Sequence, residues 1–491
     1  MKLKQLFKGI EGVEIRGSKD IELTGISTDS RIISPGHLFL AKQGISDHGV
    51  DFISHALDSG ASAILTDLYD PFVKVPQIIA PNPGALEALL ASKFYGDPSR
   101  ELYVVGVTGT KGKTTTSYMV HHLLQELGLS CGLVGTVETI VGTESRSSTL
   151  TTHSSIKNQK LLREMVLRGC HAAALEVSSH GLDQGRTENI AFDCVIFTNL
   201  TPDHLDYHQS LEKYAAAKRK LFEQLDESPK KNKRALINAD SEWSSFMKGR
   251  ESVWTFGLEK PGDRSGDKSA DISASHLRTE NGQTHFVVEF AGHQEAFAIP
   301  VMGRFNVYNA LGAIGVGLHR GAGLSQIASA MRSFKTAPGR LEPIANDRGL
   351  SIFVDYAHTG EALENVLKTL REIAQQKIIC IFGCGGNRDP QRRTNMAKAA
   401  EQYADIAIIT SDNPRGEDPM AICQEVLAGF RDPGFPRVEV DRRAAIHLGL
   451  EFAKAGDIVL IAGKGHEKVQ ILAHQTIAFD DCAVVREALQ M

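Results

Sequence analysis

The sequence lacks the features that would place it in a membrane, outside the cell or on nucleic acid. Its 491 residues contain no apolar run near the roughly 18 residues that span a bilayer, and MKLKQLFKGIEGVEIRG at the start has no apolar secretory segment. The seven cysteines are odd in number and form no CxxC pair, which favours reduced thiols over a disulfide framework. A net charge of −5 argues against nucleic acid as the main partner. We therefore expect a soluble cytoplasmic protein with no membrane insertion and no nucleic-acid partner.

What is present is ordinary globular composition, with 42% hydrophobic and 23% charged residues. The length exceeds what one hydrophobic core usually serves, so several domains are expected. No internal repeat or low-complexity tract occurs. From Tyr103 onward, short β-branched runs alternate with amphipathic helical stretches, a pattern typical of mainly parallel, doubly wound sheets. The sequence thus predicts an α/β fold.

Changes in this rhythm predict three domains. Residues 1–98 mix turn residues with short apolar runs such as ASAILTD, and predict a small α/β domain that ends near the linker DPSREL. Residues 99–336 predict a central doubly wound sheet with buried strands at YVVGV, HAAALEV and DCVIFTN, and an antiparallel hairpin within 257–300. Residues 337–491, beginning at APGRLEPI, predict a C-terminal Rossmann-like sheet built from SIFVDYAH, IICIFG, AIITSD and DIVLIAG.

A glycine-rich segment, GTKGKT, lies between a predicted strand and a predicted helix. Glycines let backbone N–H groups turn toward phosphate oxygens, and the helix N-terminus adds positive potential. Lys113 can reach the β- and γ-phosphates and the Thr114 hydroxyl can bind Mg²⁺, although Val107 stands where a full phosphate-loop motif has glycine. The context favours ATP binding over a plain glycine-rich turn. The predicted ATP loop consists of Gly109, Thr110, Lys111, Gly112, Lys113, Thr114 and Thr115.

Other polar groups are less decisive from spacing alone. Glu176 ends a predicted buried strand, where a carboxylate suits Mg²⁺ but could also cap or pair locally. His204 and His208 are four residues apart, yet helix capping by Asp203 with solvated histidines explains that segment better than zinc does. Lys218 lies on a predicted helix, where a solvated side chain is the default.

Together these segments resemble the Mur ligases, ATP-dependent amide-forming enzymes of peptidoglycan precursor synthesis. GTKGKTT, EVSSHGL, TNLTPDHLDYH, the lysine of AAAK, NVYNAL, PGRLE and DYAHT occur in that family's order over roughly residues 25–470. The resemblance implies a UDP-binding N-terminal domain, a central ATPase domain and a C-terminal amino-acid-binding domain.

The resemblance also implies roles for individual residues. Lys218 would be carbamylated, two Mg²⁺ sites are expected, and the metal ligands would be Thr114, Glu176, His204 and Lys218. The catalytic residues would be Lys113, Glu176, His204 and Lys218. The ATP site would be completed by Asn306, Arg340, Asp355 and His358. The UDP-linked substrate would be held by Thr28, Ser30, Ile45, Ser46, Asp47, Thr151, Thr152, Ser178, Gln184 and Arg186. Local geometry is open at three departures from the family, His153, Phe305 and Gly360.

The motif DNPR, residues 412–415, follows the predicted strand AIITS and bears on the amino acid that is added. meso-Diaminopimelate differs from lysine by a second carboxylate, which a guanidinium can grip bidentately, whereas lysine would leave that guanidinium unpaired. Such a mismatch discriminates strongly, although Asn-Pro by itself is also a common turn. The resemblance implies a diaminopimelate site made of Arg388, Asp412, Asn413, Pro414, Arg415, Gly463 and Glu467.

We therefore expect a monomeric ligase that uses ATP and Mg²⁺. It would join meso-diaminopimelate to the D-glutamyl γ-carboxylate of UDP-N-acetylmuramoyl-L-alanyl-D-glutamate through an acyl phosphate. Three alternatives stay open: the same reaction with L-lysine, a folylpolyglutamate synthetase-like ligase, and a non-catalytic nucleotide-binding scaffold. Arg415 argues against the first, DNPR and the UDP-site residues against the second, and the set Lys113, Glu176, His204 and Lys218 against the third.

Overall fold

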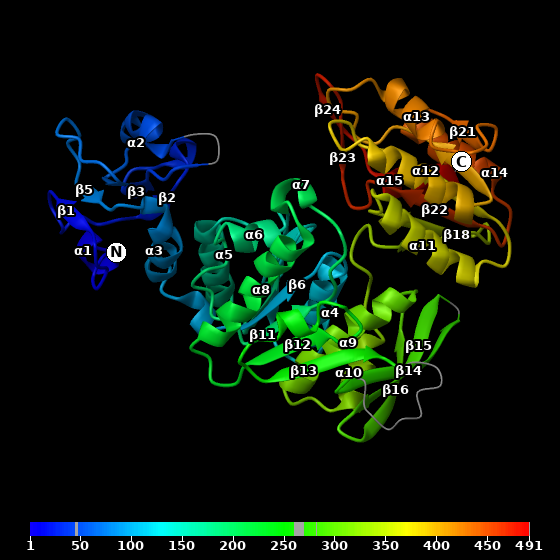
Figure 1. The fold of residues 1–491 in the computed structure, drawn as a ribbon, viewed down its shortest axis with the longest axis horizontal. Coiled ribbons are helices and arrows are strands. Elements are labelled where there is room, and N and C mark those ends of the chain that lie inside the picture. The colour runs from blue at the N-terminus through cyan, green and yellow to red at the C-terminus, as the bar shows by residue number, and fades with distance from the viewer. Residues whose placement is uncertain (45–47, 260–269, 281, 491) are drawn as a thin grey trace. The chain divides into compact units, whose positions relative to one another are not determined.

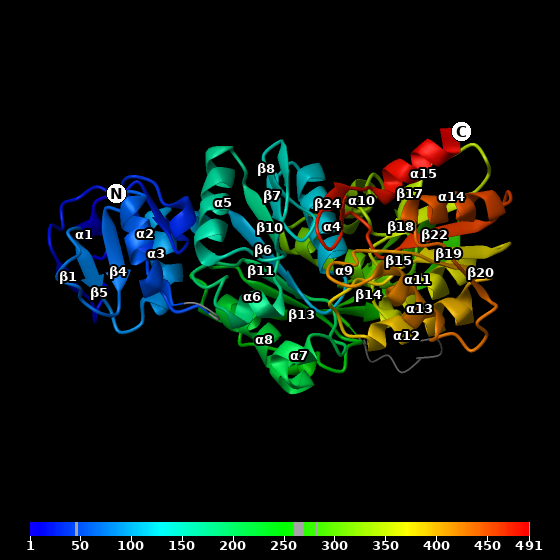
Figure 2. The ribbon, with the colours of Figure 1, turned by 90° about the horizontal axis from the view of Figure 1, so that it is seen from above.

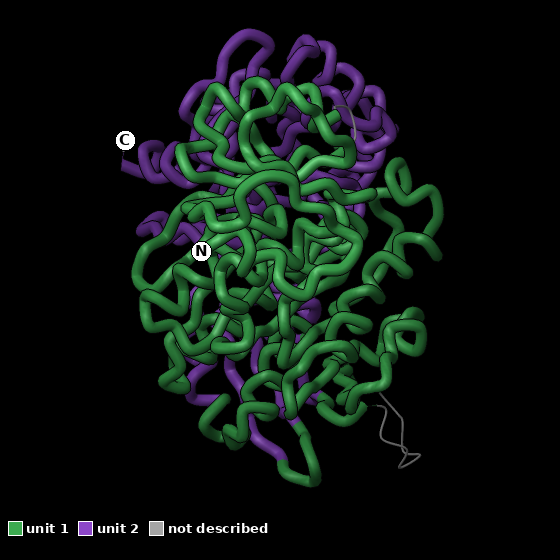
Figure 3. Tube along the Cα trace, turned by 90° about the vertical axis from the view of Figure 1, so that its left-hand side faces the viewer, with its two compact units in different colours: residues 1–273, 289–293, 308–327 green, residues 274–288, 294–307, 328–491 purple. Residues whose placement is uncertain are grey.

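A computed structural model describes residues 1–44, 48–259, 270–280 and 282–490 (Figure 1). The chain divides into two compact units, drawn in different colours in Figure 3. Unit 1 contains residues 1–273, 289–293 and 308–327, and unit 2 contains residues 274–288, 294–307 and 328–491. Each unit is described by itself below.

The N-terminal sheet has the strand order β1-β5-β4-β3-β2 among the described residues. Strands β2 to β5 are parallel and β1 runs antiparallel to β5. Side chains alternate between two small cores: Leu38 and Leu65 pack with the face that α1 and α3 cover, while Phe39 and Ile64 pack on the α2 side. The strands are β1 (Glu14–Arg16), β2 (Gly25–Ser27), β3 (His37–Leu40), β4 (Ala63–Thr66) and β5 (Gln77–Ile79). The helices are α1 (Leu3–Leu6), α2 (Ile53–Asp58), α3 (Glu87–Phe94) and the short 3₁₀ turns η1 (Ser30–Ile32), η2 (Gly49–Phe52), η3 (Pro83–Leu86) and η4 (Pro98–Arg100).

The central sheet carries parallel strands in the order β7-β10-β6-β11-β12-β13, with β8 and β9 added antiparallel at the β7 edge. The predicted strands at YVVGV, HAAALEV and DCVIFTN are confirmed as β6, β10 and β11. The strands are β6 (Tyr103–Thr108), β7 (Cys131–Val134), β8 (Glu138–Val141), β9 (Glu144–Ser147), β10 (Ala172–Glu176), β11 (Cys194–Phe197), β12 (Arg234–Asn238) and β13 (Val253–Leu258). Strands β6, β7, β10 and β11 are buried along their whole length, since helices cover the sheet.

Helix α4, which follows β6, buries the apolar residues Met119, Val120, Leu123 and Leu124. Helices α5 and α8 supply the core that covers β10 and β11. The helices are α4 (Lys113–Glu126), α5 (Ser155–Leu167), α6 (Ser179–Asp183), α7 (Leu205–His208), α8 (Leu211–Glu227), η5 (Ser245–Met247), α9 (Arg304–His319) and α10 (Leu324–Met331).

The predicted antiparallel excursion within 257–300 is present as three further strands at the β13 edge, in the order β16-β15-β14-β13. These strands are β14 (Ile272–Glu280), β15 (Gln283–Phe290) and β16 (His293–Ile299). The apolar runs THFVVEF and EAFAIP in the sequence predicted β15 and β16. The sequence of β14 gave no comparable signal, and its residues range from buried to exposed.

The C-terminal sheet, entirely in unit 2, has the order β17-β18-β22-β19-β20-β21 among the described residues. Only β17 is antiparallel, so the predicted strands β18, β19, β20 and β22 are all confirmed as parallel neighbours. Helices α11 to α13 cover one face and α14 and α15 the other (Figure 2), each over its own apolar core. The strands are β17 (Glu342–Ile344), β18 (Ser351–Asp355), β19 (Ile378–Phe382), β20 (Ile406–Ile409), β21 (Pro436–Val438), β22 (Ile458–Ala462) and the separate hairpin β23 (Val469–Ile471) and β24 (Thr476–Ala478). The helices are α11 (Gly360–Ile373), α12 (Gln391–Tyr403), α13 (Pro419–Leu427), α14 (Arg442–Phe452) and α15 (Asp481–Gln490).

Candidate functional site

The glycine-rich loop joins the end of β6 to the start of α4, as the sequence predicts for a phosphate-binding loop. The loop is fastened to the exit of β11, because Asn199 Oδ1 accepts from Lys111 N at 2.9 Å and Thr198 Oγ1 donates to Lys111 O at 2.6 Å. Gly109 has a φ of 150°, and a Cβ there would collide with Thr198 Oγ1, so glycine is required. Lys113 turns back over the loop and donates to Gly109 O at 3.0 Å. The loop is therefore held in one shape at a helix N-terminus, where backbone amides suit an anion.

Glu176 lies at the carboxyl end of β10, directly beside this loop. Its side chain is almost fully buried, yet its hydrogen bonds come from neutral donors. Thr114 Oγ1 donates to Oε2 at 2.9 Å, and Thr136 donates to Oε1 through its backbone N at 2.8 Å and to Oε2 through its hydroxyl at 2.9 Å. Carboxylate and hydroxyl oxygens gathered in this way are the ligands that a hard cation prefers. Thr136 was missed by sequence reasoning, since no motif marks it.

The predicted substrate-binding residues before and after β10 form one hydrogen-bonded group. Thr152 Oγ1 donates to Glu176 O at 3.0 Å and accepts from Ser178 N at 2.9 Å. Arg186 donates to Thr152 O at 2.8 Å and also pairs with Gln184 Oε1. Thr151 reaches the same group through the Thr136 hydroxyl at 3.0 Å. The structure thus brings five predicted residues to the Glu176 strand exit.

Lys218 is a buried lysine on α8, not the solvated side chain that is the default for a helical lysine. Its ammonium donates to Gly109 O at 2.7 Å and lies over the Tyr214 ring, 4.3 Å from the centroid. Burial, together with the positive charge of Lys113, lowers the pKa of Lys218 well below its ordinary value. The side chain therefore brings a weakly protonated amine to the phosphate loop.

His204 also lies near Tyr214, with the two ring centroids 6.2 Å apart. Partial burial lowers the pKa of His204, and the charges of Lys113 and Lys218 act in the same direction. Asp203 Oδ1 accepts from His204 N at 2.9 Å, but His204 is itself the N-cap of α7 and no side chain caps that helix, so the capping role considered for Asp203 is not confirmed. Within the described ranges no three His, Cys, Asp or Glu side chains gather to hold a metal ion, so a zinc cluster has no support there. An oxygen-rich site built on Thr114 and Glu176 has a different composition and stays compatible with Mg²⁺.

The predicted UDP-site residues in the first domain lie on a different sheet. Thr28 follows β2, and the buried Ser30 begins η1, which Asp29 caps by accepting from Arg31 N at 3.0 Å. The structure records no hydrogen bond from these two residues to the Thr152 group within the parts of the chain it describes. Ile45, Ser46 and Asp47 lie outside the described residues.

In unit 2 the segments PGRLE, DYAHT and GKGHE come together. Asp355 ends β18 and accepts from Leu341 N at 2.7 Å, while its backbone oxygen accepts from Gly463 N at 3.1 Å. The Arg340 guanidinium lies 5.0 Å from the Tyr356 ring centroid, and the Tyr356 ring contacts those of His358 and His466. Asn306, also in unit 2, donates to Met302 O at 2.7 Å. Burial raises the pKa of Asp355, and the charge of Arg340 opposes that rise.

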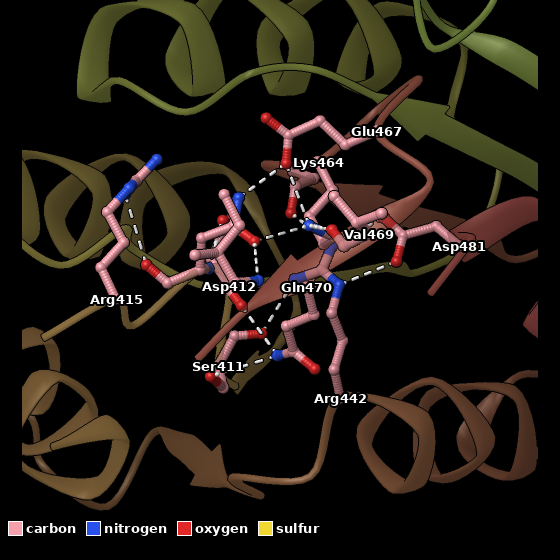
Figure 4. Close-up of polar contacts among 12 residues, drawn as sticks. Ser411, Asp412, Arg415, Arg442, Lys464, Glu467, Val469, Gln470 and Asp481 are labelled. Atoms are coloured by element: carbon pink, nitrogen blue, oxygen red, sulfur yellow. Dashed lines mark hydrogen bonds and ion pairs between the residues drawn. The ribbon is translucent and has the colours of Figure 1, made fainter. Parts of the chain in front are cut away.

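The DNPR segment follows β20, and its first two residues are buried in a polar network (Figure 4). Gln470 donates to Asp412 O at 2.7 Å, and Asn413 Nδ2 donates to Glu467 Oε2 at 2.7 Å. Gly463 has a φ of 114°, and a Cβ there would press on Asp412 Oδ2, which explains the glycine. The predicted residues Asp412, Asn413, Gly463 and Glu467 therefore meet at one edge of the sheet.

The two predicted arginines lie on adjoining loops at this edge. Gly386 N donates to Asn413 O at 2.9 Å, and Arg415 Nη1 donates to Gly386 O at 3.0 Å. Arg388 is exposed and Arg415 is half-buried, whereas Pro414 between the polar residues is buried. The arginine heads therefore border a buried polar floor, as expected for a site that binds a carboxylate.

Sequence reasoning missed the buried charges behind this edge, Lys464, Arg442 and Asp481. Arg442 and Asp481 form an ion pair at 2.7 Å with both side chains fully buried. Arg442 also donates to Ala462 O at 3.0 Å and to Ser411 O at 3.4 Å, which ties the exits of β22 and β20 together. In the sequence, the only indication for Arg442 and Asp481 was their position near the start of a helix, α14 and α15 respectively.

The departures from the resemblance have local explanations at two positions. A side chain on Gly360 would collide with Asn395, so glycine permits the close approach of α11 and α12. His153 is buried and its ring nitrogen lies 3.4 Å from Ser148 Oγ. Phe305 is 37% exposed near the start of α9 and the structure gives no reason for it.

Comparisons with known proteins agree with this arrangement of sheets and loops. The Mur ligase family, catalytic domain, matches residues 22–90; the Mur ligase middle domain matches residues 107–317; and the Mur ligase, glutamate ligase domain matches residues 339–465. The chain belongs to the Mur ligase family and is an enzyme of the ligase class.

Full-length relatives share one name, UDP-N-acetylmuramoyl-L-alanyl-D-glutamate–2,6-diaminopimelate ligase. The protein of that name from Chlamydia felis is 43% identical, over 100% of this chain and 99% of its own length. The one from Geobacillus thermodenitrificans is 38% identical over the same shares of both chains. A solved structure with this name is 31% identical with a TM-score of 0.71, covering 100% of this chain and 99% of its own. The MurF ligase from Thermotoga maritima in complex with ADP is 18% identical with a TM-score of 0.65, covers 96% of this chain and 97% of its own, and shares the fold.

Proposed function

We propose that this protein joins 2,6-diaminopimelate to UDP-N-acetylmuramoyl-L-alanyl-D-glutamate in peptidoglycan precursor synthesis, with ATP as the energy source. The observation that carries the proposal is the pairing of two built sites. Unit 1 has a phosphate loop beside a buried carboxylate, Glu176. Unit 2 has Arg415 beside the buried Asp412 and Asn413, and Asn413 is hydrogen-bonded to the partly exposed Glu467. The full-length relatives bear the name of this reaction.

The first chemical step is assigned to unit 1. The γ-phosphate of ATP passes to the D-glutamyl γ-carboxylate, forming an acyl phosphate and releasing ADP. Lys113 and the amides at the start of α4 would stabilise the charge on the transferred group. The group of Thr151, Thr152, Ser178, Gln184 and Arg186 would hold the dipeptide carboxylate, and Thr28 and Ser30 the UDP end.

Magnesium fits the donors present beside the loop. Thr114 Oγ1 and the Glu176 carboxylate are oxygen ligands 2.9 Å apart, and within the described part of the chain the carboxylate accepts hydrogen bonds from Thr114 and Thr136. These two residues would hold one ion, and His204 with a modified Lys218 would contribute to a second. When bound, the ion supplies positive charge that stabilises the phosphoryl oxygens.

The modification proposed for Lys218 is a carbamate. The neutral amine nitrogen bonds to the carbon of CO₂ and one proton leaves, so an ammonium is replaced by a carboxylate. The complete burial of Lys218 and the nearby positive charge of Lys113 both favour the neutral amine at this position. A ¹³C signal of a carbamate after growth in ¹³CO₂, absent in Lys218→Arg, would support it, and its absence in the wild-type protein would contradict it.

The second step is assigned to the amino acid held by unit 2. The amine of diaminopimelate attacks the acyl phosphate carbon, phosphate leaves and an amide remains. Arg388 and Arg415 would bind the distal carboxylate, Glu467 the distal ammonium, and Asp412, Asn413, Pro414 and Gly463 would shape the site. Asn306, Arg340, Asp355 and His358 are assigned to ATP.

We also propose that the three sheets mark three domains, residues 1–98, 99–336 and 337–491, and that the protein acts as a monomer in the cytoplasm. None of the described helices is long and apolar enough to cross a membrane.

The test is phosphate release with ATP, Mg²⁺ and the UDP-linked dipeptide, comparing meso-diaminopimelate with L-lysine. Release that depends on diaminopimelate supports the proposal. A preference for lysine would keep the ligase chemistry and overturn the assigned amino acid, and release with neither would overturn the function.

A further inference from the structure

The loop GKGHE places a fully buried lysine in the floor of the amino-acid site. Lys464 lies between two glycines in left-handed conformations, with φ of 114° at Gly463 and 53° at Gly465. Its side chain has 0% exposure, although an ammonium is costly to remove from water unless it is fully partnered. A buried ammonium at this position is therefore stable only if each of its N–H groups has an acceptor.

All three N–H donors of Lys464 have acceptors. The ammonium donates to Val469 O at 2.7 Å, to Glu467 Oε2 at 3.0 Å and to Asn413 Oδ1 at 3.1 Å. The bond to Val469 anchors the lysine to β23, while the other two bonds reach side chains assigned to the substrate. Figure 4 shows the ammonium at the centre of these groups.

The contacts of Lys464 determine which way the Asn413 amide points. Asn413 Oδ1 accepts from Lys464 and, at 2.9 Å, from Ile471 N. Because both neighbours are donors, only the amide oxygen can occupy this side, and the NH₂ group must face the other way. There Nδ2 donates to Glu467 Oε2 at 2.7 Å.

Glu467 is in turn held through one oxygen. Oε2 receives both bonds, from Lys464 and from Asn413, and Figure 4 shows the other oxygen directed away from them. The side chain is 27% exposed, so the second oxygen borders solvent. Burial opposes ionisation of this carboxyl, but the charge of Lys464 and the bonds from Lys464 and Asn413 hold its pKa below its ordinary value.

We propose that Lys464 is a positioning residue for amino-acid specificity: it fixes Asn413 and Glu467 so that Glu467 Oε1 receives the distal ammonium of the diamino acid. The inference rests on the proposed function and deepens it. In diaminopimelate the distal amine and the distal carboxylate are attached to the same carbon. If Arg415 binds that carboxylate, an anion must be held at a fixed position nearby to bind the amine. Lys464 holds Glu467 in that position and does not itself contact the substrate.

The experiment uses two amino acids that differ only at the distal amine. 2-Aminopimelate keeps the reacting amine and both carboxylates of diaminopimelate but lacks the second amine. Phosphate release is measured with each for the full-length wild type and Lys464→Met. The control is Lys468→Met, the same change at an exposed lysine of this segment, whose ion pair is with Asp480.

We expect Lys464→Met to lower kcat/KM for diaminopimelate by about 10- to 100-fold, the range for losing a hydrogen bond to a charged group. The value for 2-aminopimelate should change little, the KM for ATP should stay the same, and Lys468→Met should behave as wild type. Glu467→Gln should produce the same selective loss, and adding Lys464→Met to it should cause little more.

Equal losses with both amino acids would overturn the inference, because a purely structural lysine would weaken the site for either one. Wild type that releases phosphate with neither would instead overturn the proposed function, and this inference with it. If Lys464→Met does not fold, Lys464→Gln, which keeps two N–H donors but no charge, is compared in the same way.

Discussion

Two carboxylates, the buried Glu176 in unit 1 and the partly exposed Glu467 in unit 2, are held in opposite ways. Glu176 takes its hydrogen bonds from the hydroxyls of Thr114 and Thr136 and from one backbone N–H. Glu467 is bonded by the ammonium of Lys464 and by Asn413, both on the same oxygen. The oxygens gathered around Glu176 are ligands that a metal ion prefers, whereas a carboxylate with a built-in cation offers a single directed oxygen to a polar ligand.

The groups that support the two sites also differ in charge. The loop beside Glu176 is fixed mainly by backbone groups and by Thr198 and Asn199. The floor around Glu467 is supported from behind by the buried Arg442–Asp481 pair. We therefore expect charge substitutions behind the second site to change stability, and those at the first to change activity with little effect on stability.

The largest effect is expected from Arg442→Met. Removing the guanidinium leaves Asp481 buried and uncompensated and frees Ser411 O and Ala462 O, which should cost about 3–5 kcal/mol of unfolding free energy. Urea denaturation measures this loss. Arg443→Met is the matched control, because its pair with Glu487 is exposed and should contribute under about 1 kcal/mol. Equal stability of the two variants would contradict the role given to the buried pair.

Glu176→Gln should strongly lower activity and change stability little, the opposite of Arg442→Met. The amide keeps an oxygen for Thr136 N but removes the charge proposed to hold Mg²⁺, so phosphate release should fall roughly 10²- to 10³-fold. The unfolding free energy should change much less than in Arg442→Met. Glu223→Gln, on the exposed side of α8, is the control. Unchanged turnover at saturating Mg²⁺ would remove Glu176 from the metal site.

The sequence predicted the middle strands of the two larger sheets because these strands are continuous apolar runs. YVVGV, HAAALEV, DCVIFTN and the C-terminal runs are buried on both faces, and this pattern is readable without a structure. In residues 1–98 only ASAILTD was predicted as a strand, since strands of three residues such as β1, β2 and β5 are too short to show periodicity.

The candidate sites could be predicted where a short motif contains the functional residues, but not where a residue's role depends on its burial. GTKGKT and DNPR are such motifs, because their residue types indicate what they bind. Lys464 and Arg442 look like ordinary surface charges in the sequence, and their burial follows only from how β20, β22 and the hairpin β23–β24 meet. The glycine at 360 likewise makes sense only beside Asn395 of α12.

Arg415→Met tests the cationic border of the second site. If its guanidinium binds the distal carboxylate, kcat/KM for diaminopimelate should fall about 10²-fold, as for truncating one partner of a charged hydrogen-bonded pair. Turnover with L-lysine, which has no such carboxylate, should fall much less, so the ratio between the two amino acids measures the effect. Arg431→Met, at a side chain that is 92% exposed, is the control. A uniform loss with both amino acids would indicate that Arg415 only supports the loop through Gly386.

The smallest effect concerns pH and separates the two ways of holding a carboxylate. The pKa of Glu467 is depressed, so its ionised form, and the binding that depends on it, is lost only as pH falls through that low value. In Lys464→Met the ammonium is gone, and burial then raises the pKa of Glu467. We expect the KM for diaminopimelate to be level in the wild type between about pH 5 and 8, and to rise a few-fold toward the acid end in the variant. Asp412 and His466 also titrate near this carboxyl, so the comparison is made against Lys468→Met, which keeps both. Parallel profiles in the three proteins would mean that Lys464 places Glu467 without controlling its charge.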